Sequence, residues 1–124
     1  MSKKLKNRAT LEDILASCAD SFFPAHPVKI DSRRPDGDTP LHVMLWQENA
    51  YAALELIKAG ADVNAAGDMG ETPLHIAVKK QNLSVIEALI DAGADSMFKS
   101  ELGQSPKDLA IAQGGDVARF FTDR

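Results

Sequence analysis

One nine-residue phrase occurs three times in this chain at a fixed interval of 33 residues. It reads "GDTPLHVML" at 37–45, "GETPLHIAV" at 70–78 and, with more substitutions, "GQSPKDLAI" at 103–111. Gly60 and Gly93 keep the same interval inside "KAGADVN" and "DAGADSM". Self-similarity at such an interval indicates units that cannot bury their apolar faces alone and must stack on their neighbours. A row of repeated units is therefore expected.

Each unit predicts two helices joined by a turn. Gly70 provides a positive-φ turn, Thr72 can cap the first helix, and Pro73 suits its first position because no backbone donor is needed there. Apolar residues within 74–78 then follow at i, i+3 and i+4, as on one helical face. A second apolar helix is expected over the residues that end at Gly93, a typical helix terminator. The predicted unit is turn, helix, turn, helix.

The phrases "GETPLHIAV…ALIDAGADS" and "GDTPLHVML…ELIKAGADVN" resemble ankyrin repeats, and the resemblance covers roughly residues 28–121. It implies an all-α solenoid of antiparallel helix pairs, with hairpin loops projecting sideways to give an L-shaped cross-section. We expect one domain over 1–124. It is divided into a basic tail and N-terminal cap (1–36), two repeats (37–69 and 70–102) and a C-terminal capping repeat (103–124).

Both ends of the row depart from the phrase. A cap helix is predicted over 10–21, with Thr10 and Asp13 as a capping box. Its expected buried stripe is Leu11, Ile14, Leu15 and Cys18. The turn around Pro24 and Pro27 does not fit the family pattern, and His26 within it has no assigned role.

The last unit is more polar. Lys107 and Asp108 stand where the second repeat has a leucine and a histidine, as suits a terminal unit that faces water. If Gly114 matches Gln81, one residue must be deleted before Asp116 for Val117 and Phe121 to match the apolar positions of the previous repeat.

Composition limits the class of protein. The longest apolar run is far below the roughly 18 residues of a membrane span, and acidic residues interrupt any secretory signal in the first 20 residues. We therefore expect a cytoplasmic protein without membrane contact. The single cysteine, Cys18, cannot form a disulfide within the chain, in agreement with a reducing compartment.

Charge is unevenly distributed. Four of the 14 basic residues lie among the first eight residues, so the remaining chain has 10 basic against 18 acidic residues. An acidic body repels phosphate backbones, which excludes nucleic-acid binding by the domain itself. The basic tail is interpreted as a solvated terminus, with a nuclear-import or nucleic-acid patch as the alternative.

Candidate catalytic and metal-binding residues are few. His42 and His75 each fall at the third position of a helix, where the ring can reach back to the capping threonine, so a structural role is predicted. Neither has a ligand-type neighbour at metal spacing, and no nucleophile, base and orienter can be assembled. We expect no enzymatic activity, no metal and no cofactor.

The resemblance also implies where a partner would bind: on a concave surface made by the hairpin tips and the outward side of each first helix. Carried onto this chain, the predicted contact residues are Asp36, Asp38, Trp46, Gln47, Asp68, Met69, Glu71, Lys79, Lys80, Glu101 and Leu102. They combine five carboxylates with three apolar anchors, a composition that suits a basic protein surface. Trp46 could instead pack against the N-terminal helix or Phe22 and Phe23, and Tyr51 is expected to pack.

The predicted function is non-enzymatic protein binding, by a monomer or by a heterodimer with its partner. Compact bacterial ankyrin proteins, which this chain resembles, include immunity proteins that mask a toxin, so a basic toxin or other enzyme is one predicted partner. The alternative is an adaptor or regulatory subunit of an intracellular complex, with the basic tail as a second contact. An undetected catalyst would need a cleft of perturbed titratable groups.

Overall fold

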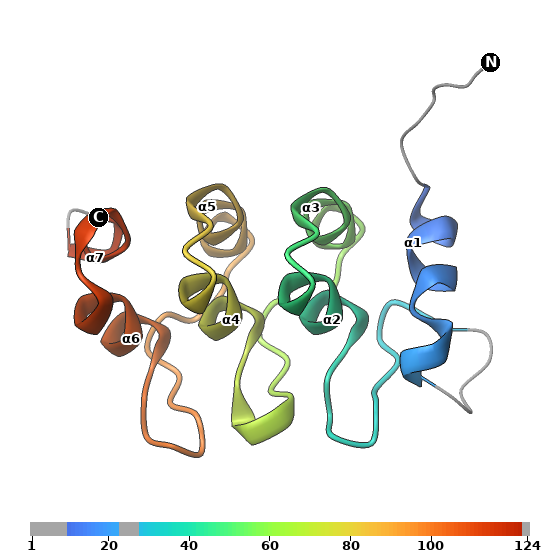
Figure 1. Ribbon diagram of the computed structural model, residues 1–124, viewed down its shortest axis with the longest axis horizontal. Coiled ribbons are helices and arrows are strands. Elements are labelled where there is room, and N and C mark those ends of the chain that lie inside the picture. The colour runs from blue at the N-terminus through green and yellow to red at the C-terminus, as the bar shows by residue number, and fades with distance from the viewer. Residues whose placement is uncertain (1–9, 23–27, 123–124) are drawn as a thin grey trace.

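The computed structural model describes residues 10–22 and 28–122, and arranges them in two rows of helices (Figure 1). The inner row is α2 (Pro40–Trp46), α4 (Pro73–Lys79) and α6 (Pro106–Gln113), and the outer row is α3 (Ala50–Lys58), α5 (Leu83–Asp91) and α7 (Gly115–Thr122). Each inner helix contacts the outer helix that follows it, and α4 also contacts the inner helices on both of its sides, α2 and α6. The described residues contain no strand, so the predicted all-α ankyrin-type solenoid is confirmed.

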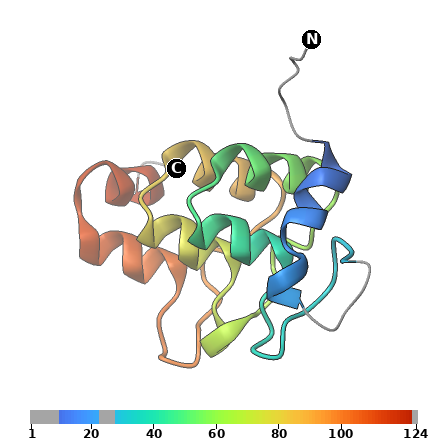
Figure 2. The ribbon, with the colours of Figure 1, turned by 45° about the vertical axis from the view of Figure 1, so that its right-hand side comes forward.

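Hairpin loops extend from the inner row to one side, which gives the L-shaped cross-section (Figures 1 and 2). Each inner helix begins after Thr39, Thr72 or Ser105, with proline at its first position, as predicted. The third helical residue completes a capping box with that residue in all three helices. The phrase therefore fixes both the start of each inner helix and the side from which its hairpin enters.

The turn between α6 and α7 is shorter than the other two turns. Glu48 and Gln81 both have φ of 58°, whereas Gly114, with φ of 73° and ψ of −168°, lies outside the left-handed helical region. Asn49 and Asn82 then cap α3 and α5, whereas α7 begins directly at Gly115. Gly114 both ends α6 and precedes α7, and its carbonyl accepts from the N–H of Ala118 at 3.4 Å, so the backbone does not reproduce the predicted match of Gly114 to Gln81.

The N-terminal cap differs in part from the prediction. Helix α1 (Leu11–Ser17) is shorter than the expected 10–21, and a 3₁₀ turn, η1 (Ala19–Phe22), follows it. The Thr10–Asp13 capping box is present. Ile14 and Cys18 are buried and Leu15 is partly buried, but Leu11 is 36% exposed. Helix α1 packs against α3, and this contact covers only a narrow stripe of α1. Leu11, the fourth residue of the expected stripe, lies at its edge.

Several predictions fall outside the described residues: those on the basic tail within 1–9 and on the segment 23–27, which holds Phe23, Pro24, His26 and Pro27.

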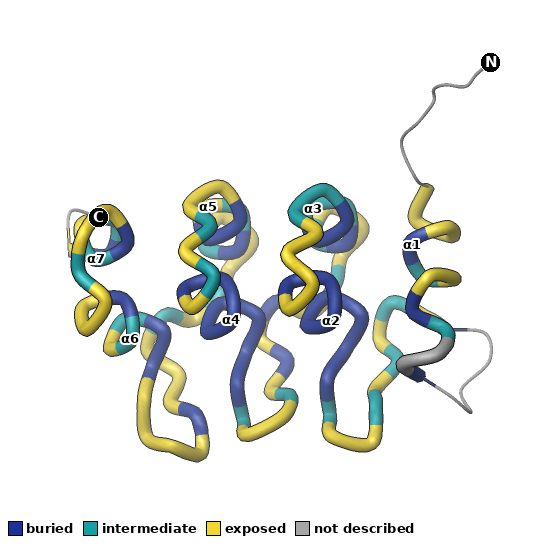
Figure 3. The backbone as a smooth tube through the Cα atoms, in the orientation of Figure 1, coloured by how far each residue is buried: buried dark blue, intermediate teal, exposed yellow. Residues whose placement is uncertain are grey.

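The core runs without interruption along the row, as the buried segments in Figure 3 show. Inner helices α2 and α4 each bury six consecutive residues, whereas α6 buries only Pro106 and Ala110. Val117 and Phe121 are buried on α7, as their match to the previous repeat predicted. The terminal unit is therefore packed on one side, and its opposite side faces solvent.

Candidate protein-binding surface

Hydrogen bonds between neighbouring units hold the hairpins in place. The Arg33 guanidinium donates to the carbonyl of Gly37 at 3.0 Å and to that of Ala66, in the next hairpin, at 2.8 Å. The backbone N–H of Glu101 donates to the carbonyl of Met69 at 2.9 Å, which joins the next pair of hairpins. A partner would thus meet loops whose backbone positions are already set.

The two repeat histidines add further links between units. The N–H of Thr39 donates to Nδ1 of His42 at 3.1 Å, so the ring hydrogen lies on Nε2, which donates to the carbonyl of Glu71 at 3.0 Å. His75 repeats this arrangement, and its Nε2 donates to the carbonyl of Gln104 at 2.8 Å. Burial lowers the pKa of both rings, which favours the neutral form that these bonds require. The predicted capping role is confirmed, and the bond to the next hairpin is an addition.

Two of the five predicted contact carboxylates are buried. Asp38 is 4% exposed, and its carboxylate accepts from the backbone N–H of Asp68 at 2.8 Å. Glu71 is 7% exposed and forms an ion pair with Lys79 at 2.5 Å. These two predicted contact residues expose little of their surface to a partner, because they satisfy donors inside the stack. A side chain at Gly67 would overlap the Asp38 carboxylate, so this contact requires glycine.

The other three carboxylates are exposed, but they differ in their pairing. Asp36 forms an ion pair with Arg34 at 3.4 Å. Asp68 and Glu101, near the tips of the next two hairpins, have no ion-pair partner among the described residues. The pattern "SRRPDGD", which places two arginines shortly before the hairpin glycine, is the sequence signal for this ion pair. Negative charge available to a partner is therefore concentrated on the second and third hairpins.

Trp46 is 41% exposed at the C-terminal end of α2. The ammonium groups of Lys79 and Lys80 lie 5.7 and 5.5 Å from the centroid of its ring, within the range of cation–π attraction. Both lysines belong to the end of α4 and the turn after it, on the side of α2 away from α1. The ring is thus oriented by the second repeat and remains open to solvent. Tyr51, by contrast, is half-buried against the core.

The remaining apolar anchors lie at hairpin tips: Met69 is 45% exposed and Leu102 62% exposed. The side chain of Lys79 extends from the end of α4 to Glu71 in the hairpin arm. The side of α4 that carries Lys79 and the hairpins therefore belong to one surface. The inner surface is defined here as the exposed or half-buried members of the predicted set: Asp36, Trp46, Gln47, Asp68, Met69, Lys79, Lys80, Glu101 and Leu102.

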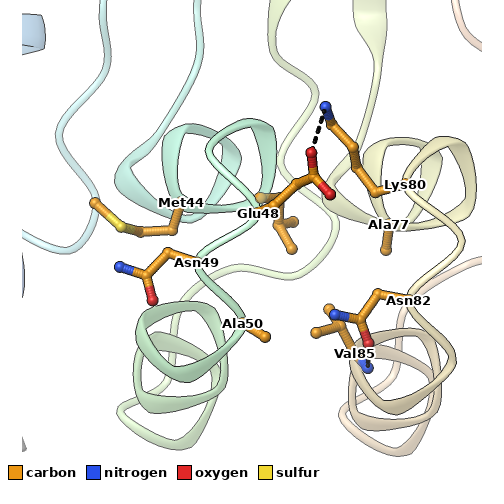
Figure 4. A pocket seen from close by; sticks show the side chains of 9 residues that line it. Met44, Glu48, Asn49, Ala50, Ala77, Lys80, Asn82 and Val85 are labelled. Carbon is orange, nitrogen blue, oxygen red and sulfur yellow. Dashed lines mark hydrogen bonds and ion pairs between the residues drawn. The ribbon is translucent and has the colours of Figure 1, made fainter.

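A small pocket adjoins this surface between the two inter-helix turns of the full repeats (Figure 4). Its volume is about 80 Å³, its floor includes Ala77 and Val85, and Glu48 and Lys80 form an ion pair of 3.5 Å beside it. Small-molecule sites usually have about 300–1,000 Å³. This pocket has room for one aliphatic side chain of a partner rather than for a substrate.

Neither a metal centre nor a membrane span is found in the described residues. No three His, Cys, Asp or Glu side chains among them gather closely enough to hold a metal ion. Every helix in 10–22 and 28–122 is too short or too polar to cross a bilayer.

Comparison with protein families gives a match over most of the chain. The family model described as ankyrin repeats, in three copies, matches residues 7–100 and 47–122. The chain belongs to the ankyrin-repeat family. Ankyrin-repeat domains are typically non-catalytic modules that bind other proteins, so a protein partner follows from the family. No curated protein matches the chain.

Proposed function

We propose that this ankyrin-repeat protein binds its partner through the inner surface, with Trp46 as the central anchor. The observation that carries the proposal is that a large aromatic ring stays 41% exposed on a helix whose other six residues are buried. Aromatic residues held in a defined orientation and surrounded by polar groups are typical hot spots of protein interfaces. The stack does not need this ring for its core.

Affinity would come from the preformed geometry. The hairpins are joined through Arg33, Asp38 and the two histidines, so little conformational entropy remains to be lost on binding. The inner surface extends over three hairpins, which suits an interface of standard size, about 800 Å² on each partner.

The proposed partner presents basic groups to Asp68 and Glu101 and an aliphatic side chain to the pocket beside Trp46. The unpaired carboxylates support this charge preference, since they would gain cationic partners without breaking an internal ion pair. A toxin or another enzyme with a basic substrate channel has such a surface, and masking it would make this chain an inhibitor or immunity protein.

The alternative is an adaptor or regulatory subunit. It is favoured by the internal pairing of Asp36, Asp38 and Glu71, which leaves a smaller acidic field than an inhibitor of a strongly basic enzyme would use. Co-expression distinguishes the two functions: relief of a partner's toxicity or activity supports inhibition, and an unchanged activity in a stable complex supports the adaptor.

The test of the surface begins with capture of the partner on the immobilised chain and its identification by mass spectrometry. Trp46→Ala should then weaken binding of the purified partner by about 2 kcal/mol, roughly thirtyfold, while the melting temperature stays unchanged. Asp68→Lys should weaken it further for a basic partner. Leu83→Ala is the matched control, because Leu83 is also exposed, by 37%, but lies on outer helix α5. Equal affinity of Trp46→Ala and wild type would reject the inner surface.

A further inference from the structure

The repeat provides an internal reference for the face that each unit presents to the next. His75 donates to the carbonyl of Gln104 in the following unit. The side-chain amide of Asn64 donates to the carbonyl of Gly93 at 3.1 Å and accepts from the backbone N–H of Asp95 at 2.8 Å. Positions 64 and 75 therefore face the following unit, and Val78, three residues after His75, lies on the same side of α4.

The same positions one interval later are Met97, Asp108 and Ile111, and they form an open face. No described helix follows α6 and α7 at this end of the row (Figure 1). Met97 is 60% exposed and Ile111 51% exposed, whereas Val78 is fully buried. Together with Lys99, which pairs with Asp108 at 3.4 Å, these three residues define the C-terminal face.

The C-terminal face stays apolar at the positions that contact the following unit inside the row. Exposed ends of repeat stacks need polar residues for solubility. Lys107 follows this rule, since it replaces a buried leucine. Ile111 does not, and Met97 is more apolar than Asn64, its counterpart inside the stack. The composition is that of a surface that is covered in the working state.

We propose that a second copy of this chain covers the C-terminal face, in a two-fold symmetric dimer. The charges support this occupant. In a two-fold contact the same patch meets itself, so Lys99 of one copy can pair with Asp108 of the other while Met97 and Ile111 are buried between them. One cation and one anion beside two apolar residues make the patch complementary to itself.

The other end of the row favours a closed dimer over a growing filament. There, α1 packs against α3 and buries Ile14 and Cys18, so the N-terminal end of the stack is already covered. Head-to-tail addition of copies would have to displace this helix. The C-terminal face shares no residue with the inner surface, and this inference does not depend on the proposed function.

Sedimentation velocity of the full chain over a wide range of concentrations tests the proposal. The expected result is a monomer–dimer equilibrium, and Ile111→Lys should raise the dissociation constant at least about tenfold by placing two ammonium groups at the contact. Met97→Asn, which restores the residue of the internal repeat, should weaken the dimer as well. Circular dichroism should show unchanged helix content, because both side chains are exposed in the monomer.

Met69→Asn is the matched control, since Met69 is a similarly exposed methionine on the inner surface, and it should leave the dimer intact. A chain that stays monomeric at every concentration overturns the proposal. So does a dimer that survives Ile111→Lys but is lost in Trp46→Ala, because the contact would then use the inner surface. Assemblies that grow beyond the dimer would also overturn it, since they indicate head-to-tail stacking.

Discussion

At the scale of single residues, the third position of each inner helix shows how one side chain can serve two units. His42 and His75 use Nδ1 to accept from their own capping threonine and Nε2 to donate to the next hairpin. Asp108, at the same position, accepts the capping bond, but its carboxylate has no hydrogen to donate to a following hairpin. Aspartate therefore stands where no described hairpin follows, and histidine stands where one does.

This arrangement predicts a pH dependence of stability. Burial lowers the pKa of His42 and His75, with the nearby Asp38 carboxylate opposing the effect at His42, so the folded chain binds fewer protons than the unfolded chain below about pH 6.5. Their contribution to the free energy of unfolding is complete above that pH and is lost as the pH falls toward the lowered folded-state pKa. Each ring contributes a slope of up to about 1.4 kcal/mol per pH unit.

Urea unfolding between about pH 7.5 and 5.5 measures this slope. His75→Asp, which copies the last unit, is the matched variant, since a carboxylate of ordinary pKa near 4 scarcely titrates in that range. It should be less stable at neutral pH but show a shallower slope. A slope equal to that of wild type would contradict the assignment of a neutral, buried ring.

At the scale of elements, the inner helices are buried more completely than their apolar pattern indicates. The expected face of α4 was Leu74, Ala77 and Val78, yet Ile76 is also buried to 1% exposure. The reason is that α4 lies between α2 and α6, against α5, and beside its hairpin, so almost every direction is covered. Such contacts are set by the stack and are invisible in a seven-residue segment.

Leu74 is fully buried in this helix, and Leu74→Ala should lower the free energy of unfolding by about 2–5 kcal/mol. The loss combines the transfer of the deleted methyl groups with the cavity left between rows. Leu102→Ala serves as the control, because Leu102 is 62% exposed and its truncation should change stability by less than about 0.5 kcal/mol. Chemical denaturation of both variants measures the difference, and similar values for the two would contradict the packing described for α4.

At the scale of the whole molecule, stability depends on contacts between adjacent units. The last unit buries little of α6, and a row this short approaches the lower limit for an independent solenoid. Each unit thus depends on its neighbours to cover its apolar face. We therefore propose that the stacked units form a single domain.

One cooperative unfolding transition is the expected consequence. Helix content followed by circular dichroism and the fluorescence of Trp46, the single tryptophan, should change at the same denaturant concentration. Trp46 reports on the junction of the first and second repeats, so an earlier or later fluorescence transition would show that the units unfold separately and would contradict the single domain.

The sequence by itself determined the period, the start of every inner helix and the family, because these depend on local turn and capping chemistry repeated at a fixed interval. It also placed the capping histidines and most of the exposed candidate residues. The tertiary structure decided what distant residues do to each other: it buried Asp38 against the next hairpin, paired Glu71 with Lys79, and set two lysines beside Trp46. The contacts of Asp38 and Trp46 arise between units, and the Glu71–Lys79 ion pair joins a hairpin to a helix within one unit, so a pattern that repeats along the chain carries no record of which side chains meet.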